Sequence, residues 1–237
     1  MQSKYAIKMA GVQFAWPGGN AFTLGVAEFV LATGERVLLT GPSGTGKSTF
    51  LSLLCGVVTP QSGSIEVLST ELTRLSGAQR DRFRAEHFGI IFQMFNLLPY
   101  ASARDNVLLP LHFATERRKR ASLSSSAEDE ASRLLMSVGI QQGLITGPRA
   151  ATFSVGQQQR VAAARALIGA PEIIVADEPT SALDRNRQTQ FLDLLFSEAG
   201  KHKSAVIMVS HDESLGSRFD RVLPLDEIAI SIKNELA

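Results

Sequence analysis

Nine consecutive residues of this sequence have the types and spacing of a phosphate-binding loop. Residues 41–49 read G-P-S-G-T-G-K-S-T and fit G-x-x-x-x-G-K-[ST] at every position. The apolar run at residues 36–40 is predicted to be a strand, and residues 50–55 suit a helix. Such a strand, glycine-rich turn and helix present backbone N–H groups and a positive helix end to phosphate oxygens. A glycine-rich turn without a ligand is the alternative, and the flanks and the Lys-Ser pair argue against it.

The residues of this loop have separate predicted tasks. Lys47 can reach the outer phosphates, and the hydroxyl of Ser48 is short enough to bind a magnesium ion. The predicted phosphate contacts are Gly41, Pro42, Ser43, Gly44, Thr45, Gly46, Lys47, Ser48 and Thr49.

Two adjacent carboxylates end another apolar run. Residues 173–176 are apolar and lead directly into Asp177 and Glu178. Carboxylates at the end of a buried strand are paired or bind something. In a protein with a phosphate loop, Asp177 is expected to reach magnesium through water, and Glu178 is placed to polarise an attacking water. The alternative is a pair of acids at a surface turn before Pro179.

A second helix start also suits an anion. Ser154 and Gln157 form a predicted capping box before a strong helix former, and Gly156 leaves N–H donors accessible to a phosphate from outside. A capped helix without a ligand explains the local pattern equally well.

Two ring side chains allow two interpretations each. Trp16 is either a core aromatic that follows Val12 and Phe14 on one strand face, or a plate under a nucleotide base. His211 follows the apolar run at residues 205–209. It either occupies the start of a helix capped by Ser210 and Glu213, or contacts the γ-phosphate at the carboxyl end of a strand.

Composition excludes several classes of protein. The net charge is +1, from 24 basic and 23 acidic residues, so no strong field favours nucleic acid or acidic lipid. Cys55 is the single cysteine, which excludes an internal disulfide and fits a reducing compartment. No apolar run approaches the roughly 20 residues of a membrane span, and the N-terminus does not resemble a signal peptide. We expect a soluble, cytosolic chain.

The remaining patterns predict the organisation of the chain. The expected elements are a hairpin-like unit at residues 4–16 and 22–30 with a turn at 17–20, a strand at 63–67, and a closing hairpin at 221–230. From residue 94 to about 149, prolines punctuate helical spacing, which predicts an inserted helical lobe. Within it, residues 116–126 are predicted to be a solvated polar loop.

Together, these motifs resemble the ATP-binding subunit of ABC transporters over essentially the whole chain. The set comprises Trp16, the loop at 41–49, Gln93 after a strand, the signature at 154–157, Asp177 with Glu178, Asp184, and His211. The resemblance implies an α/β fold of the P-loop NTPase type, with a mostly parallel core sheet, an antiparallel β subdomain and an inserted helical subdomain. It assigns residues 1–93 and 161–237 to the core with the β subdomain, and 94–160 to the helical subdomain, within a single ATPase domain.

The resemblance also implies the role of each residue, with ATP and Mg²⁺ as cofactors. Trp16 would stack on adenine; Ser48, Gln93 and Asp177 would hold magnesium. Glu178 would activate water, with Lys47, Gln93 and His211 assisting catalysis. The signature residues Ser154, Gly156 and Gln157 would close over the nucleotide of a second copy of the chain. The usual signature is L-S-G-G-Q, and here Phe153 and Val155 replace its leucine and first glycine. Since valine keeps its backbone N–H, the signature is expected still to close over ATP. The substitution could change how strongly it does so.

Details around Gln93 and Glu178 are similar to one group within the family. The segments at 97–99, 106–107 and 175–180 resemble lipoprotein-releasing, macrolide-efflux, glycolipid-exporter (DevA-type) and FtsE-like ATPases. The implied partners are an integral membrane permease and a second copy of the chain, without nucleic acid. The implied location is peripheral, on the cytoplasmic side of the inner membrane. Two alternatives stay open: a regulatory ATPase that drives a membrane partner without transport, and a soluble ABC ATPase. For a ribosome-associated ATPase with a long coiled-coil insert, too few residues separate Gln93 from Ser154.

Overall fold

The computed structural model describes residues 4–17, 22–181 and 183–233. By compactness the chain divides into two units. The first unit comprises residues 1–84 and 207–237, and the second unit comprises residues 85–206. Part of the turn predicted at 17–20 lies outside the described residues. The subdomain bounds assigned from the sequence stay a prediction.

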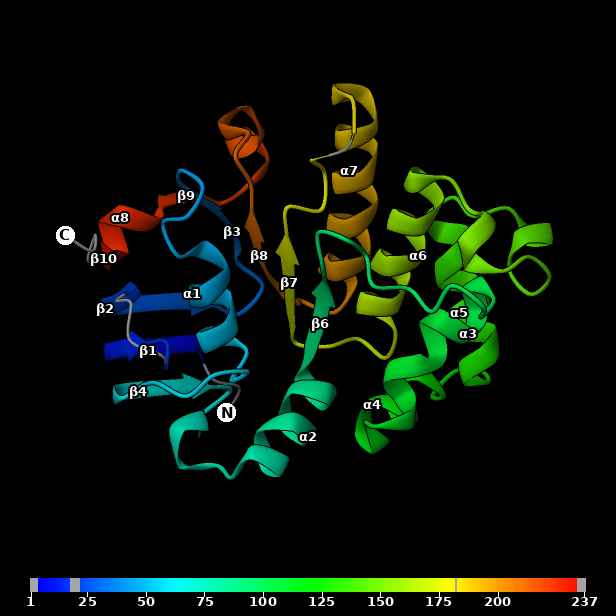
Figure 1. The fold of residues 1–237 in the computed structure, drawn as a ribbon. Helices are drawn as coiled ribbons and strands as arrows, with labels where there is room; N and C mark the ends of the chain where they lie inside the picture. The colour runs from blue at the N-terminus through cyan, green and yellow to red at the C-terminus, as the bar shows by residue number, and fades with distance from the viewer. Residues whose placement is uncertain (1–3, 18–21, 182, 234–237) are drawn as a thin grey trace. The chain divides into compact units, whose positions relative to one another are not determined.

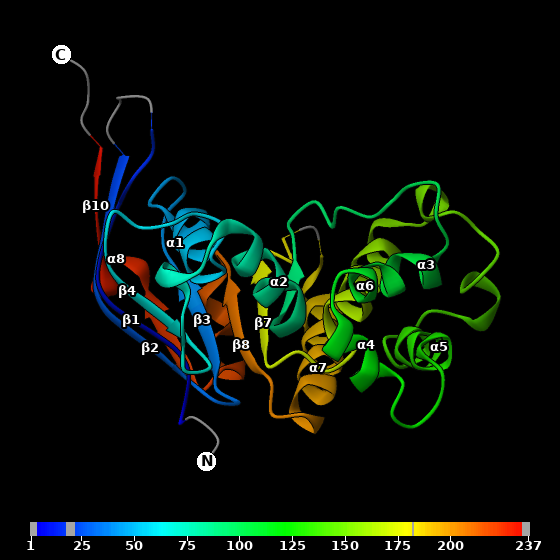
Figure 2. The same ribbon diagram turned by 90° about the horizontal axis from the view of Figure 1, so that it is seen from below.

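An antiparallel sheet forms one layer of the first unit (Figures 1 and 2). Its strands follow the order β10-β2-β1-β4-β5, and their bounds are β1 Tyr5–Ala15, β2 Phe22–Ala32, β4 Ser62–Val67, β5 Thr70–Glu71 and β10 Ala229–Lys233. β1 pairs with β2 from Tyr5 opposite Ala32 to Ala15 opposite Thr23. The hairpin-like unit and the strand near residue 65 are therefore confirmed.

A bulge changes which residues of β1 face the core. Ile7 and Met9 are buried before Gly11, and Val12 and Phe14 are buried after it, so the alternation shifts by one residue. Gly11 has a φ of 59°, and the register between β1 and β4 shifts there. Gly63 of β4 approaches this bulge so closely that a Cβ atom would lie 2.4 Å from the Gly11 carbonyl oxygen. Only glycine fits at position 63, where β4 approaches β1 this closely.

The first unit also contains a parallel strand pair. β3 (Arg36–Thr40) pairs with β9 (Arg221–Pro224). The chain then makes one helical turn, α8 (Leu225–Ile228), before β10 pairs with β2. The predicted closing hairpin at 221–230 is therefore wrong. β9 and β10 pair with different strands because the chain between them forms a helical turn that begins at the buried Leu225. A hairpin would need a tight β-turn at this place.

The other helical elements of the first unit are α1 Lys47–Leu54, η1 Leu72–Arg74, α2 Gly77–His87, whose last turn belongs to the second unit, and η5 Glu213–Arg218. α1 packs on the antiparallel sheet through Phe50, whose ring meets Phe29 of β2 edge to face with 5.1 Å between centroids. This contact fixes the helix that follows the glycine-rich loop.

The second unit combines two parallel strands with a helical lobe, as expected (Figure 1). β6 (Phe88–Ile91) pairs with β7 (Ile173–Asp177). The helical elements are α3 Ala103–Leu108, η2 Leu109–His112, α4 Thr115–Ala121, α5 Ala127–Ser137, η3 Gln142–Leu144, η4 Ala150–Thr152, α6 Val155–Leu167 and α7 Arg185–Lys201. β8 (Ala205–Val209) begins in this unit and ends in the first. Within the described ranges, no helix has the length and apolar character that a membrane crossing requires.

Part of the polar stretch predicted as a solvated loop forms the helix α4, which contains a buried arginine. Arg117 in α4 is only 2% exposed, and its guanidinium donates to the carbonyl oxygens of Phe88, Ala166 and Ile168 at 2.7 Å each. Burial lowers the pKa of this guanidinium from its ordinary value to about 9. The prediction failed because the carbonyls at the end of α6, which need donors, come from a distant part of the sequence.

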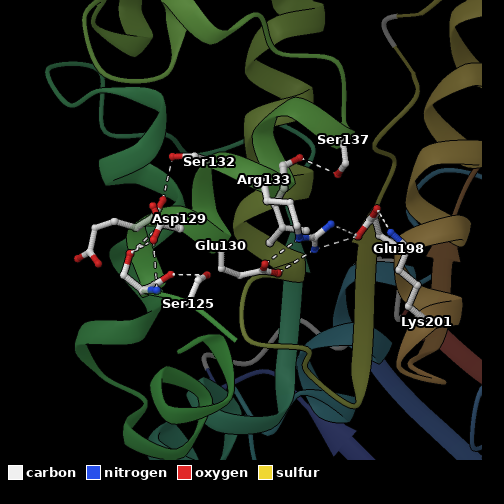
Figure 3. A network of polar contacts seen from close by, with 11 residues as sticks. Ser125, Asp129, Glu130, Ser132, Arg133, Ser137, Glu198 and Lys201 are labelled. Carbon is white, nitrogen blue, oxygen red and sulfur yellow. Dashed lines mark hydrogen bonds and ion pairs between the residues drawn. The ribbon is translucent and has the colours of Figure 1, made fainter. Parts of the chain in front are cut away.

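An ion-pair cluster joins α5 to α7 (Figure 3). Arg133 contacts Glu130 on its own helix at 2.7 Å and Glu198 of α7 at 3.2 Å, and Lys201 also pairs with Glu198. Burial raises the pKa of the Glu198 carboxyl, but hydrogen bonds from Lys201 and Arg133 outweigh this and hold that pKa below its ordinary value of 4.5. The charged form of Glu198 therefore stabilises the folded second unit.

Replacing Gly63 with alanine should destabilise the protein by about 2 kcal/mol or more, because the new Cβ would clash with backbone and the φ of 86° strains any L residue. Urea unfolding measures the change. Gly77→Ala is the matched control, since a Cβ there meets nothing within 4 Å at the start of α2. Equal stabilities of the two variants would refute the close crossing.

Replacing Glu198 with glutamine should lower the free energy of unfolding by about 1–2 kcal/mol at pH 7. The pKa of Glu198 is depressed by folding, so its contribution is present above pH 4.5 and is lost as the pH falls through the lower folded-state pKa. The difference between wild type and variant should thus shrink below pH 4.5 in urea titrations. Glu28→Gln, at an exposed site on β2, should show no such trend. A constant difference down to pH 3 would contradict the role of the charged carboxylate.

Candidate functional site

The glycine-rich loop connects β3 to α1 within the first unit. Gly46 precedes α1 with a φ of 106°, a conformation that glycine adopts without strain, and no side chain caps the helix. The first-turn N–H groups of a helix point out of its start, which is the direction from which a helix binds an anion. The predicted strand, turn and helix are all present.

The amine of Lys47 lies within the curve of this loop. Its Nζ donates to the carbonyl oxygens of Gly41 at 2.6 Å and Pro42 at 2.8 Å, and the side chain is buried. The Thr45 hydroxyl also donates to the Pro42 carbonyl, at 2.9 Å. These bonds hold the loop curved around the cation, at the place where phosphate oxygens would bring negative charge.

Trp16 lies beside the loop and is not a core aromatic. It follows the end of β1, is 49% exposed, and donates from Nε1 to the Thr49 hydroxyl at 3.3 Å. Phe14 supports the indole edge to face at a centroid distance of 5.1 Å. Of the two interpretations from the sequence, the structure excludes burial and brings an exposed aromatic face to the start of α1.

His211 is exposed just after β8, in the first unit. The capping box predicted for Ser210 and Glu213 is wrong. Asp212 is the N-cap of η5 and accepts from the Ser214 N–H at 3.0 Å, whereas the Ser210 hydroxyl accepts from the Asp212 N–H. The shorter carboxylate reaches the first turn of a 3₁₀ helix better than Glu213 could from within that turn. His211 therefore lies before the cap, in the connection from the strand.

In the second unit, Gln93 and the two carboxylates lie at the same edge of a parallel strand pair. Ile91, the last residue of β6, is in register with Ala176, and Asp177 ends β7. Gln93 is exposed two residues beyond β6. Glu178 follows Asp177 with a φ of 47°, a left-handed conformation that is uncommon for a residue with a side chain. The carboxyl ends of parallel strands are the usual place for polar ligands in open α/β sheets.

Signature residues begin α6 as predicted. The Ser154 hydroxyl accepts from the Gln157 N–H at 3.3 Å, and Gln157 Oε1 accepts from the Ser154 N–H at 2.9 Å. The two departures from the usual signature have opposite environments: Phe153 is buried in the second unit, whereas Val155 is 52% exposed. A Cβ on Gly156 would meet nothing within 4 Å.

The turn after Glu178 is held by side chains that the sequence reasoning missed. Gln159 of α6 donates from Nε2 to the Pro179 carbonyl at 2.7 Å, and Gln188 of α7 donates to the Thr180 carbonyl at 3.3 Å. Both glutamines are buried. The sequence could have indicated this role for Gln159. It lies on the same helical face as the apolar Ala162 and Ala163, so it is expected to be buried, and a buried polar side chain needs a hydrogen-bond partner.

Arg165, near the other end of α6, holds the segment after Gln93. Its guanidinium donates to the carbonyl oxygens of Phe95 and Asn96, the latter at 2.7 Å. Both of these residues have positive φ, of 58° and 49°. Burial lowers the pKa of Arg165. α6 thus forms hydrogen bonds both to the segment after Gln93 and to the turn after Glu178.

The predicted site residues fall into two sets. Trp16, the loop at 41–49 and His211 belong to the first unit; Gln93, the signature at 154–157, Asp177 and Glu178 belong to the second. Within these sets, the structure brings Trp16 to the loop and aligns the strand ends that precede Gln93 and Glu178.

Comparison with known proteins gives consistent matches. The family model described as "ABC transporter" matches residues 24–181. The chain is 40% identical over 198 residues to the uncharacterized ABC transporter ATP-binding protein YbbA of Escherichia coli K12, covering 84% of this chain and 83% of that protein. It is 37% identical over 200 residues to the lipoprotein-releasing system ATP-binding protein LolD of Legionella pneumophila strain Paris, covering 84% and 85%.

A solved structure is similar over nearly the whole chain. It is the dimeric post-hydrolysis state of the ATP-binding cassette MJ0796 bound to ADP and Pi. The TM-score is 0.80 at 28% identity, with 98% of this chain and 100% of that chain covered.

Proposed function

Because the chain belongs to the ABC transporter family, as an ATP-binding subunit that hydrolyses ATP, we propose a role for each of its two units. The first unit binds the nucleotide, and the second unit supplies the carboxylate that activates water. Hydrolysis of ATP to ADP and phosphate then drives a separate membrane protein. The observation that carries this proposal is the loop at 41–49, with its buried lysine and the aromatic fastened to Thr49.

In the first unit, Trp16 stacks on the adenine ring, and the loop N–H groups with Lys47 hold the phosphates. The exposed indole face and its hydrogen bond to Thr49 support the first role, since the same bond sets the spacing between base and phosphate sites. Lys47 exchanges its carbonyl acceptors for phosphate oxygens, which form stronger charge-assisted bonds. His211 contacts the γ-phosphate.

In the second unit, Glu178 accepts a proton from the attacking water as that water adds to the γ-phosphorus. The bond from the γ-phosphorus to the bridging oxygen breaks, and ADP leaves with that oxygen. Gln93 helps to position the water, and its place at the same strand edge as Asp177 supports this role.

The donor set fits magnesium. Ser48, Gln93 and Asp177 supply hydroxyl, amide and carboxylate oxygens, the hard ligands that magnesium prefers. Among the described residues no three His, Cys, Asp or Glu side chains gather into a metal cluster. Magnesium that arrives with ATP needs none, because phosphates and waters complete its shell. When bound, the ion neutralises charge on the phosphates.

The proposed working form is a dimer on a membrane permease. The signature residues Ser154, Gly156 and Gln157 of one copy close over the nucleotide of the other. The solved MJ0796 cassette is a dimer bound to ADP and Pi, which supports this arrangement. The chain would attach peripherally to the cytoplasmic face of the inner membrane, with no nucleic-acid partner. Likeness to LolD, named for a lipoprotein-releasing system, favours an exporting, lipoprotein-extruding or force-transmitting complex.

Replacing Glu178 with glutamine should lower kcat for ATP hydrolysis about 100-fold or more, while the Kd for ATP stays within twofold. The amide keeps the size of the side chain but cannot accept the proton. Phosphate release and fluorescent-nucleotide titration measure the two quantities. Glu227→Gln, an exposed acid in α8, is the control and should behave as wild type. Turnover at the wild-type rate in Glu178→Gln would refute Glu178 as the base.

The same Glu178→Gln protein tests the partner, since it should retain ATP and the closed dimer. Purified with ATP in detergent, it should retain a permease with few spans and a large external domain. A many-span partner would contradict the proposed group, and no membrane partner would favour the soluble alternative. A partner that moves no substrate would favour the regulatory one.

Replacing Lys47 with methionine should weaken ATP binding at least about tenfold, because the aliphatic stem is kept and the charged hydrogen-bond donor is lost. Nucleotide titration with thermal unfolding in parallel separates binding from stability. Lys119→Met, at an exposed ion pair in α4, is the control. An unchanged Kd in Lys47→Met would remove this lysine from the phosphate site.

A further inference from the structure

Three consecutive glutamines at the start of α6 have three different partners. Gln157 accepts from the Ser154 N–H, and Gln158 donates to the Phe153 carbonyl at 3.0 Å, so both act on the helix start. Gln159 instead donates to the Pro179 carbonyl at 2.7 Å and is only 1% exposed. The third glutamine therefore leaves its own helix start and reaches the turn that carries Glu178.

This turn is one that needs external support. Glu178 has a φ of 47°, and such sparsely populated backbone persists only when its surroundings impose it. The three successive carbonyls from Glu178 to Thr180 each accept a hydrogen bond. Ser181 supplies the first from its N–H at 3.3 Å and its hydroxyl at 3.1 Å, and Gln159 supplies the second. The third accepts from the Leu183 N–H at 3.0 Å and from Gln188 at 3.3 Å.

The donors differ in where they come from. Ser181 and Leu183 are part of the turn itself, and Gln188 belongs to α7, which begins directly after it. Gln159 comes from α6, one helical turn beyond Val155 in the signature. Since a buried carbonyl left without its donor costs free energy, this bond ties the turn to the orientation of α6.

We infer that Gln159 is a positioning residue that sets the placement of the Glu178 carboxylate through the Pro179 carbonyl, and so links the signature end of α6 to the hydrolytic step. This inference rests on the proposed role of Glu178. It assigns to Gln159 an effect on kcat and none on nucleotide binding, because neither Gln159 nor Pro179 belongs to the nucleotide-binding set.

The first test replaces Gln159 with methionine, which keeps the length of the side chain and removes the donor. The expected result is a fall in kcat of about tenfold, as for a misplaced catalytic group, with the Kd for ATP within twofold. Val161→Ala is the matched control, because it opens a cavity in the same buried stretch of α6 without touching the turn. It should lower Tm and keep kcat below the melting range. A wild-type kcat in Gln159→Met, or an equal kcat loss in Val161→Ala, would overturn the inference.

The second test uses the pH profile of Gln159→Glu. An ionised carboxylate cannot donate to the Pro179 carbonyl, whereas a protonated one can, and burial raises the pKa of a carboxyl at this site. The ratio of variant to wild-type kcat should rise at least about threefold between pH 8 and pH 6, while the ratio for Gln159→Met stays flat. A flat ratio for Gln159→Glu would assign the effect to packing and overturn the inference.

A double variant separates this inference from the proposed function. In the Glu178→Gln background, adding Gln159→Met should not lower the residual rate further, since Gln159 acts through Glu178. A further tenfold loss would overturn the inference while Glu178 remains the base. If Glu178→Gln alone hydrolyses ATP at the wild-type rate, the proposed base fails, whatever Gln159→Met does.

Discussion

Buried backbone carbonyl groups around α6 need hydrogen-bond donors, and long polar side chains supply them. Arg117 serves the carboxyl end of α6 and the start of β6, Arg165 serves the segment after Gln93, and Gln159 serves the turn after Glu178. In an apolar interior, a carbonyl that loses such a donor costs free energy unless another donor replaces it. The same bonds set the backbone that carries the predicted catalytic groups. In the second unit, the hydrogen bonds that pair buried carbonyl groups therefore also fix the positions of the predicted catalytic residues.

A different requirement applies to the glycine-rich loop of the first unit. A phosphate site needs N–H donors and a cation, held in a loop that keeps its curved shape. Gly46 allows the left-handed turn into α1, and Lys47 occupies the curve of the loop by donating to two of its carbonyls. Packing of Phe50 against Phe29 anchors α1 on the antiparallel sheet, so the end of the helix keeps a fixed direction. The predicted phosphate site therefore depends on this packing contact.

The predicted site residues are divided between the two compact units. The proposed nucleotide contacts belong to the first unit, and Glu178, the proposed base, belongs to the second, which also contains the signature at the start of α6. A change in the orientation of α6 would reach Glu178 through one hydrogen bond, from Gln159 to the Pro179 carbonyl.

Features with local causes could be predicted from the amino-acid sequence. The phosphate loop, the capping box at Ser154 and the strand that ends in Asp177 and Glu178 depend on residues next to one another, and all are present. Strand alternation also predicted the hairpin of β1 and β2. Family membership followed from the order of these motifs.

Features that depend on partners distant in the chain became visible in the folded structure. Arg117 was predicted to be solvated because the carbonyls that it serves lie some fifty residues away. The strands around 221–230 separated because each found a different neighbour, β3 or β2. Trp16 had two open interpretations until Thr49 and its exposure were known. Burial and hydrogen-bond partners are properties of the folded chain, and local residue patterns carry them only where helix or strand periodicity reveals a buried face.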